Sequence, residues 1–212
     1  MSQERFPYEE FKIEFPSNGG VAIGLVASGR SGKTTFLSHV LSKYFKKHLS
    51  VLFTGSPQIE MSKTMGESML MTDRFIPRIT QDMYKINKET GNHYNFCVIL
   101  DDIVTEKNNK EVLKCWTIYR NSWISSIISV QDVTLWNPAG RNNITIVMLG
   151  KLNTDDRIEK TIKAYLKSYF PSGMRMIDMI KEYKEMTANH HFIVIDQLRE
   201  RIYRTKCNLD ED

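Results

Sequence analysis

Short apolar runs alternate with amphipathic segments along most of this chain. These runs lie at 21–26, 50–54, 96–100, 124–130 (where three serines interrupt the run), 144–149 and 192–195. Runs of this length are typical of strands that are buried on both faces. The segments at 36–48, 81–89, 110–119, 156–169 and 174–187 carry apolar residues at the spacing of one helix face. Strands that alternate with helices predict a three-layer α/β domain around a mostly parallel central sheet.

The two ends of the chain differ from this middle part. Residues 1–20 are polar and contain two prolines and the Gly19–Gly20 pair, so we interpret them as an N-terminal arm. Within the arm, the alternation at 11–15 is consistent with an edge strand or an oligomer contact. Residues 199–212 are first basic and then acidic, which predicts a C-terminal tail. The domain itself is therefore expected to span 21–198.

The apolar run at 21–26 leads into the sequence Ala-Ser-Gly-Arg-Ser-Gly-Lys-Thr at 27–34, and a helical pattern follows at once. This order of strand, loop and helix is that of a phosphate-binding loop, with Ala27 in place of the usual first glycine. Gly29 and Gly32 allow the backbone to curl until its N–H groups point at phosphate oxygens. The N-terminal end of the helix adds a partial positive charge to the same place.

Two side chains of the loop have their own expected roles. Lys33 is placed to reach the β- and γ-phosphates, and the Thr34 hydroxyl is placed to ligate Mg²⁺. The sequence therefore predicts that the chain binds ATP with Mg²⁺. The expected nucleotide-binding residues are Ser28, Gly29, Arg30, Ser31, Gly32, Lys33, Thr34 and Thr35.

Two carboxylates, Asp101 and Asp102, follow the apolar run at 96–100 directly. The carboxyl end of a buried strand is where α/β sheets bind their ligands. We expect Asp101 to hold Mg²⁺ through water and Asp102 to polarise the water that attacks the γ-phosphate. Glu106 is the alternative candidate for the base.

Gln131 stands at the end of the apolar run at 124–130. An amide at the tip of a strand beside the phosphate loop can sense the γ-phosphate or position the water. We therefore include Gln131 among the catalytic candidates, although a terminal glutamine that only meets solvent would have the same pattern.

The order of these motifs resembles the FtsK–HerA superfamily of ring-forming DNA-pumping ATPases, and within it the poxvirus-type genome-packaging ATPases. The residues that carry the resemblance are 27–34, 99–103 and the block from 120 to 144. It implies a P-loop NTPase fold with an additional strand between the phosphate-loop strand and the acidic strand. Asp102 stands where many relatives carry Glu, and its shorter side chain leaves the identity of the base open.

The resemblance also implies an arginine that reaches into the site of a neighbouring subunit. Arg120, eleven residues before Gln131, fits that pattern. Arg141, in the Arg-Asn-Asn sequence at 141–143, is the second candidate. Such an arginine would neutralise the charge that develops on the γ-phosphate.

As partners the resemblance implies double-stranded DNA, a homo-oligomeric ring (pentamer or hexamer) and viral capsid or vertex proteins, in the host cell cytoplasm and in the virion. The net charge of +4 permits a polyanionic partner without requiring one. Candidate DNA contacts are the stretch 107–110 and Arg74 and Arg78, each of which also fits a solvated loop charge. The adjacent His190 and His191 are interpreted as structural. No apolar run is long enough to span a bilayer.

Two other functions remain open at this stage. A P-loop nucleotide kinase would need a second phosphate-binding site and an arginine-rich lid, and neither is evident. A nucleotide-dependent assembly switch with little turnover would not need Gln131 or Arg120. We therefore expect an ATP-hydrolysing motor that translocates double-stranded DNA into a capsid.

Overall fold

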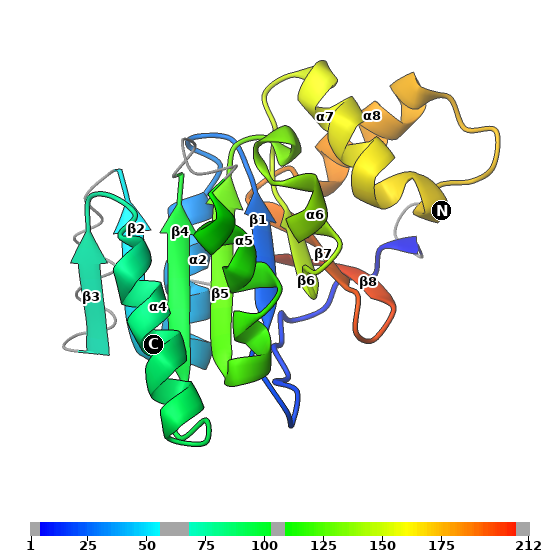
Figure 1. The fold of residues 1–212 in the computed structure, drawn as a ribbon. Helices are drawn as coiled ribbons and strands as arrows, with labels where there is room; N and C mark the ends of the chain where they lie inside the picture. The colour runs from blue at the N-terminus through cyan, green and yellow to red at the C-terminus, as the bar shows by residue number, and fades with distance from the viewer. Residues whose placement is uncertain (1–4, 56–67, 103–108, 207–212) are drawn as a thin grey trace.

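One mixed sheet runs through the computed structural model of the chain, which describes residues 5–55, 68–102 and 109–206. Within these residues its strands hydrogen-bond in the order β3-β2-β4-β5-β1-β6-β7-β8 (Figure 1). The strands are β1 (Ala22–Val26), β2 (Leu49–Thr54), β3 (Met69–Thr72), β4 (Phe96–Asp101), β5 (Ile124–Val130), β6 (Ile146–Leu149), β7 (His191–Asp196) and β8 (Arg201–Lys206). The strands from β3 to β6 in this order are parallel, whereas β7 and β8 are antiparallel to their neighbours.

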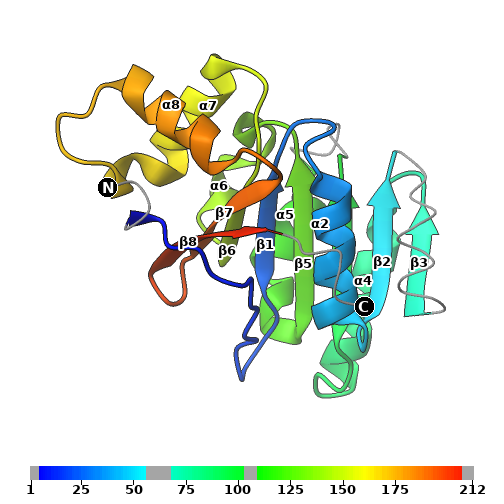
Figure 2. The same cartoon turned by 180° about the vertical axis from the view of Figure 1, so that it is seen from behind.

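Helices cover both faces of this sheet. The helices are α2 (Lys33–Val40, continued by a π-helical turn Leu41–Phe45), α4 (Pro77–Glu89), α5 (Lys110–Trp116), α6 (Pro138–Arg141), α7 (Asp155–Thr161, continued through Ile162–Leu166 and Lys167–Tyr169) and α8 (Met176–Met186). Helix α2 lies on one face, and α4, α5 and α6 lie on the other (Figures 1 and 2). The expected three-layer α/β architecture is confirmed.

Alternation along the strands divides the core into two apolar layers. In β4, Phe96, Val98 and Leu100 join the layer under α4 and α5, while Cys97 and Ile99 join the layer under α2. Because both layers are apolar, the strand reads as an uninterrupted apolar run. The same reason makes β1 recognisable in the sequence, whereas β5 is buried throughout but contains three serines.

Strand β5 lies between the phosphate-loop strand and the acidic strand. Its Ile127 pairs with Ile23 of β1 on one side and with Ile99 of β4 on the other. The expected additional strand is therefore confirmed. Its position brings the end of β5 next to the ends of both chemically important strands.

The N-terminal arm differs from the expected edge strand. Residues 9–16 form no strand, and Phe11 and Ile13 are buried in the α2 layer instead. Only Tyr8 forms an isolated bridge, to Arg204 of β8. Apolar alternation here reflects an extended segment whose side chains pack on the domain without a continuous hydrogen-bonded partner strand.

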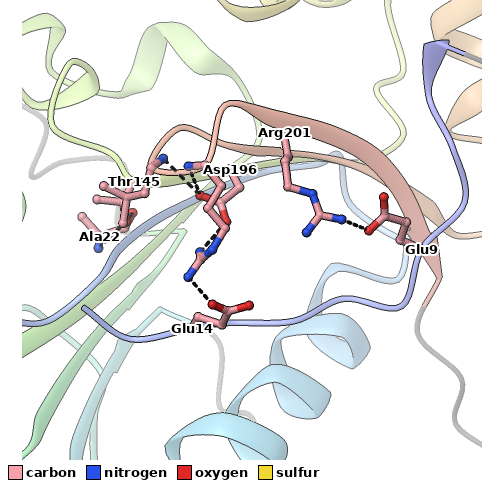
Figure 3. Close-up of polar contacts among 8 residues, drawn as sticks. Glu9, Glu14, Ala22, Thr145, Asp196 and Arg201 are labelled. Carbon is pink, nitrogen blue, oxygen red and sulfur yellow. Dashed lines mark hydrogen bonds and ion pairs between the residues drawn. The ribbon is translucent and has the colours of Figure 1, made fainter. Parts of the chain in front are cut away.

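Two strands were not predicted from the sequence. Residues 201–206, expected in a basic tail, form β8 at one edge of the sheet, and residues 69–72 form β3 at the other. Ion pairs also link the arm to the β7–β8 hairpin: Glu9 pairs with Arg201, and Arg199 bridges Glu14 and Asp196 (Figure 3).

Candidate nucleotide site

The phosphate loop begins where β1 ends and is tethered to both neighbouring strands. The Ala27 N–H donates to the Val130 carbonyl at 3.1 Å, and the Ser28 N–H donates to the Lys151 carbonyl at 2.9 Å. Gly32 has φ 88° and lies immediately before α2. This left-handed conformation favours glycine. The backbone thus turns sharply into a helix whose N-terminal end carries a partial positive charge.

Ala27, the departure from the usual motif, has a structural counterpart in Gly150. A Cβ atom on Gly150 would lie 2.9 Å from the Ala27 Cβ and 2.6 Å from Cε1 of Phe192. The missing side chain at Gly150 therefore makes room for the methyl group of Ala27. This compensation was not visible in the sequence, because the two residues belong to different strands.

Lys33 and the two acidic residues are brought together at the carboxyl ends of β1 and β4. The Lys33 Nζ atom lies 3.4 Å from Oδ1 of Asp101 and forms an ion pair with Oδ2 of Asp102. Lys33 is only 6% exposed and Asp101 only 2%. Asp101 also accepts a hydrogen bond from Ser129 Oγ on β5. A buried ammonium group that faces two carboxylates is the charge arrangement of a site for an anionic ligand with a cation.

Gln131 contacts the second carboxylate from the tip of β5. Its Nε2 atom donates to Oδ2 of Asp102 at 3.3 Å. Asp102 itself has φ 55°, and its N–H donates to the Ser129 carbonyl at 3.1 Å. The structure therefore brings together the three predicted residues Lys33, Asp102 and Gln131.

Two buried polar atoms in this place have no hydrogen-bond partner among the described residues. They are Ser31 Oγ and Asp102 Oδ1. Buried polar groups in native proteins are nearly always hydrogen-bonded to protein, water or ligand. The orphaned atoms thus fit a polar ligand that carries both acceptor and donor partners.

The residues present also fit Mg²⁺. No cluster of three or more His, Cys, Asp or Glu side chains that could hold a metal occurs in the described part of the chain. Mg²⁺ is commonly held by one or two carboxylates together with substrate phosphates, so a dedicated cluster is not needed. Thr34 is half-buried in the first turn of α2, and Asp101 lies beside Lys33.

The side chain of Ser28 is used inside the protein. Its side chain is buried, and its Oγ accepts a hydrogen bond from the Asn153 N–H at 3.1 Å. The hydroxyl therefore holds the loop in place. By contrast Gly29 and Arg30 are exposed at the tip of the loop.

Arg120 and Arg141 do not join this cluster. Arg120 precedes β5; its Nη1 atom donates to the Asn143 carbonyl at 3.2 Å, and its own carbonyl accepts from Gly20. Arg141 ends α6, close to Tyr165. Burial raises the pKa of Tyr165, and the Arg141 charge offsets only part of that rise. Both arginines precede strands, whereas the Lys33 cluster follows them.

The remaining predicted residues have local roles or lie elsewhere. Asn109 caps α5 by accepting a hydrogen bond from the Glu111 N–H, and Arg78 forms an exposed ion pair with Asp82 on α4. Arg74 is exposed. Glu106, the alternative base, and residues 107 and 108 lie outside the described residues. No helix in the described ranges is long and apolar enough to span a membrane.

His190 approaches the phosphate loop, which the sequence did not indicate. Its Nδ1 atom lies 3.2 Å from the Ser31 carbonyl oxygen. His191, its neighbour, instead contacts the Ala188 carbonyl. Ser31 and His190 are 159 residues apart in the chain, so only the fold could reveal their contact.

Comparison with known proteins supports the fold at low sequence identity. No protein-family model matches the chain, and no curated protein matches it in sequence. The chain is similar in structure to B204, the DNA-packaging ATPase of Sulfolobus Turreted Icosahedral Virus, with 13% identity, a TM-score of 0.65, and coverage of 90% of this chain and 99% of that one. It is similar to the genome-packaging NTPase B204 of Sulfolobus turreted icosahedral virus 2 in complex with AMPPCP, with 15% identity, a TM-score of 0.64 and coverage of 91% and 100%.

A non-viral structure has the same fold. The conjugation coupling protein TcpA of pCW3, solved with ATPγS, matches with 13% identity, a TM-score of 0.57, and coverage of 91% of this chain and 61% of that one. The chain thus has the fold of P-loop ATPases, and the expected structural resemblance to viral genome-packaging ATPases is confirmed.

Proposed function

We propose that this chain is an ATPase motor that translocates double-stranded DNA into a viral capsid. The observation that carries the proposal is the buried Lys33, at the end of the phosphate loop, held against Asp101 and Asp102. Gln131 on the adjacent strand contacts Asp102. A phosphate-binding loop, an acidic pair and a strand-tip amide are the parts that ATP hydrolysis needs.

The contacts suggest how the site changes when ATP binds. The Lys33 ammonium group turns from Asp102 toward the β- and γ-phosphates, which then replace that carboxylate as its partner. Asp102 is then free to polarise the attacking water, and Gln131 holds that carboxylate in place. Thr34 and Asp101 would hold Mg²⁺, which neutralises negative charge on the phosphates.

The position of Arg120 supports action on a neighbouring subunit. Arg120 precedes β5 and Gln131 follows it, and the seven residues of β5 span about 20 Å. Arg120 therefore cannot reach the site of its own subunit without a large rearrangement. In a homo-oligomeric ring, pentamer or hexamer, it would complete the site of the next subunit, and Arg141 remains the second candidate.

The DNA-packaging role rests on structural likeness. B204 of the Sulfolobus virus is described as a DNA-packaging ATPase, and nearly its whole length corresponds to this chain. We extend that role to this chain, with capsid or vertex proteins as partners and with the host cytoplasm and virion as its locations. The net charge of +4 is compatible with a phosphate backbone as partner.

Steady-state ATPase assays with and without double-stranded DNA test the proposal. We expect DNA-stimulated phosphate release that is lost in Lys33→Ala and kept in Lys43→Ala, a matched control at an exposed position of the following helical turn. Absence of turnover in both conditions would refute the motor, and DNA-independent transfer of phosphate to a nucleotide would indicate a kinase.

A further inference from the structure

We propose that His190 orients the peptide between Ser31 and Gly32 so that the Gly32 N–H points into the phosphate site. The inference deepens the proposed function, since it concerns how the same loop recognises a nucleoside diphosphate or triphosphate. His190 acts through the loop and is therefore a positioning residue.

The direction of the hydrogen bond follows from the chemistry of the two groups. The Ser31 carbonyl oxygen can only accept, so the Nδ1 atom, 3.2 Å away, must carry the proton. In a planar trans peptide the C=O and the following N–H point in opposite directions. A donor that holds the Ser31 carbonyl on the His190 side therefore directs the Gly32 N–H to the other side.

The His190 ring lies close to Gly32, although His190 itself is exposed. A Cβ atom on Gly32 would lie 2.9 Å from Nδ1 and 3.5 Å from Cγ of His190. Gly32 is thus required by the histidine ring as well as by its φ of 88°. In this arrangement the histidine ring occupies the space that a side chain at position 32 would take.

A tight turn presents the histidine to the loop. Asn189 and His190 have φ of 54° and 61°, and the His191 N–H donates to the Ala188 carbonyl at 3.2 Å. Two successive left-handed residues closed by this bond form a type I′-like turn, which Asn favours and His adopts at a cost. Strained residues of this kind persist where the surrounding structure holds them.

The elements on either side of this turn are fixed against the nucleotide site. Phe192, two residues after His190, stacks on Phe36 of α2 with ring centroids 4.3 Å apart. Before the turn, the hydroxyl of Tyr183 on α8 donates to the Gly150 carbonyl at 2.7 Å. Both contacts are buried. The turn between α8 and β7 is therefore held in place on both sides of His190.

Two substitutions separate the hydrogen bond from the turn. His190→Gly removes the donor and suits the left-handed backbone, so the fold is retained. His190→Asn also suits this backbone, and its amide nitrogen stands as many bonds from Cα as Nδ1 does. His191→Asn is the matched control, because His191 contacts Ala188 and not the loop.

Titration calorimetry of ADP binding in the presence of Mg²⁺ tests whether the His190 hydrogen bond supports the loop. We expect His190→Gly to weaken ADP about three- to tenfold, the size of one hydrogen bond, with His190→Asn within about twofold of the parent chain. Equal affinity in His190→Gly and the parent chain would overturn the proposal. Equal weakening in His190→Gly and His190→Asn would overturn it too, since the ring rather than its donor would then matter.

A spectroscopic readout distinguishes positioning from a general loss of stability. In ¹⁵N-labelled protein, the Gly32 amide resonance should move on addition of ADP in the parent chain and His190→Asn, and move much less in His190→Gly. An unchanged response of Gly32 in His190→Gly would refute the proposal. If the parent chain itself bound no ADP, that result would contradict the proposed ATPase function. It differs from a result in which the parent chain binds ADP and His190→Gly binds it equally well, which contradicts only the role of His190.

Discussion

The amide nitrogen of Gln131 lies 3.3 Å from Oδ2 of Asp102, so the tip of β5 contacts the residue that follows β4. Asp102 also forms an ion pair with Lys33 through the same oxygen. One carboxylate oxygen thus receives both the cation of the phosphate loop and the amide of the neighbouring strand. If the lysine moves to a nucleotide, as proposed, the amide would remain to orient the carboxylate.

Gln131→Ala should therefore lower kcat for ATP by about ten- to a hundredfold and leave KM within about twofold. Asp102→Asn should lower kcat by about a hundredfold or more, as expected for loss of a general base. Because the two side chains act as a unit, Gln131→Ala should add little in an Asp102→Asn background. Steady-state kinetics of the parent chain, the two single variants and the double variant would measure the coupling, with Gln197→Ala at an exposed position as control. Fully additive losses would contradict the coupling.

The parts of the site that could be predicted are those that lie on strands buried on both faces. The residues of β1 and β4 form short apolar runs, and β5 is buried along its whole length although it contains three serines. Each strand leads into recognisable chemistry: the phosphate loop, Asp101 or Gln131. Local sequence was sufficient because burial and motif coincide there.

The edges of the sheet could not be predicted for a physical reason. In β8, Tyr203 and Thr205 point inward and Arg201 is exposed, so the strand carries the charged face of an edge strand and reads as a basic tail. β3 is only four residues long and has no fully buried residue. His190 and Gly150 were missed because their partners are distant in the chain, and no local pattern marks such contacts.

The contact between Gly150 and Ala27 predicts that Gly150→Ala destabilises the fold. The added methyl group would meet Cε1 of Phe192 at 2.6 Å and Cβ of Ala27 at 2.9 Å. We expect a loss of about 1–3 kcal/mol in the free energy of unfolding, measured by urea denaturation. Ala27→Gly in the same chain should recover part of the loss. Gly55→Ala is the control, since no atom of the described residues lies within 4 Å of its added Cβ. Equal effects at 55 and 150 would argue against the compensation.

The N-terminal arm is held mainly by apolar burial. Phe6 is 0% exposed and lies 5.9 Å from Phe170 between ring centroids. Arg201, by contrast, pairs with Glu9 at the surface (Figure 3). Phe6→Ala should cost about 3–5 kcal/mol in the free energy of unfolding. Arg201→Gln should cost less than about 1 kcal/mol, because an exposed ion pair contributes little. A larger loss in the free energy of unfolding for Arg201→Gln than for Phe6→Ala, measured by urea denaturation, would show that the ion pairs hold the arm.

The partly buried His48 should lower the free energy of unfolding at acid pH. Burial between the Phe15 and Phe45 rings lowers its pKa from 6.5 to about 4. Between these two values the unfolded chain binds a proton that the folded chain does not. The free energy of unfolding therefore falls as the pH drops below 6.5, and the loss is complete below about 4. Allowing for partial exposure, we expect about 1–2 kcal/mol.

Urea denaturation at pH 7.5 and pH 5 would measure this loss. His48→Phe keeps an aromatic ring between Phe15 and Phe45 but cannot titrate. The difference between the two pH values should therefore shrink in His48→Phe. The same difference in both chains would assign the acid sensitivity to other groups.

Arg120 offers a test of the ring that does not depend on DNA. Arg120→Ala and Lys33→Ala should each abolish ATPase activity, the first by removing the finger and the second by removing the phosphate contact. If the finger acts between subunits, a site formed by Lys33 of one variant and Arg120 of the other is complete. An equimolar mixture that exchanges subunits should then recover up to about a quarter of the parent rate, the share of interfaces with both intact residues.

The matched mixtures identify which arginine acts. If Arg120 is the finger, Arg141→Ala is active by itself. Mixing it with Lys33→Ala should then give no activity beyond that of the Arg141→Ala subunits. Arg175→Ala, at an exposed position beside Asp178, should leave the rate unchanged by itself. Recovery only in the Arg141 mixture would move the finger to Arg141, which lies at the end of α6. Recovery in neither mixture would place both arginines outside the catalytic interface, because a residue that acts between subunits must be supplied by an intact neighbour.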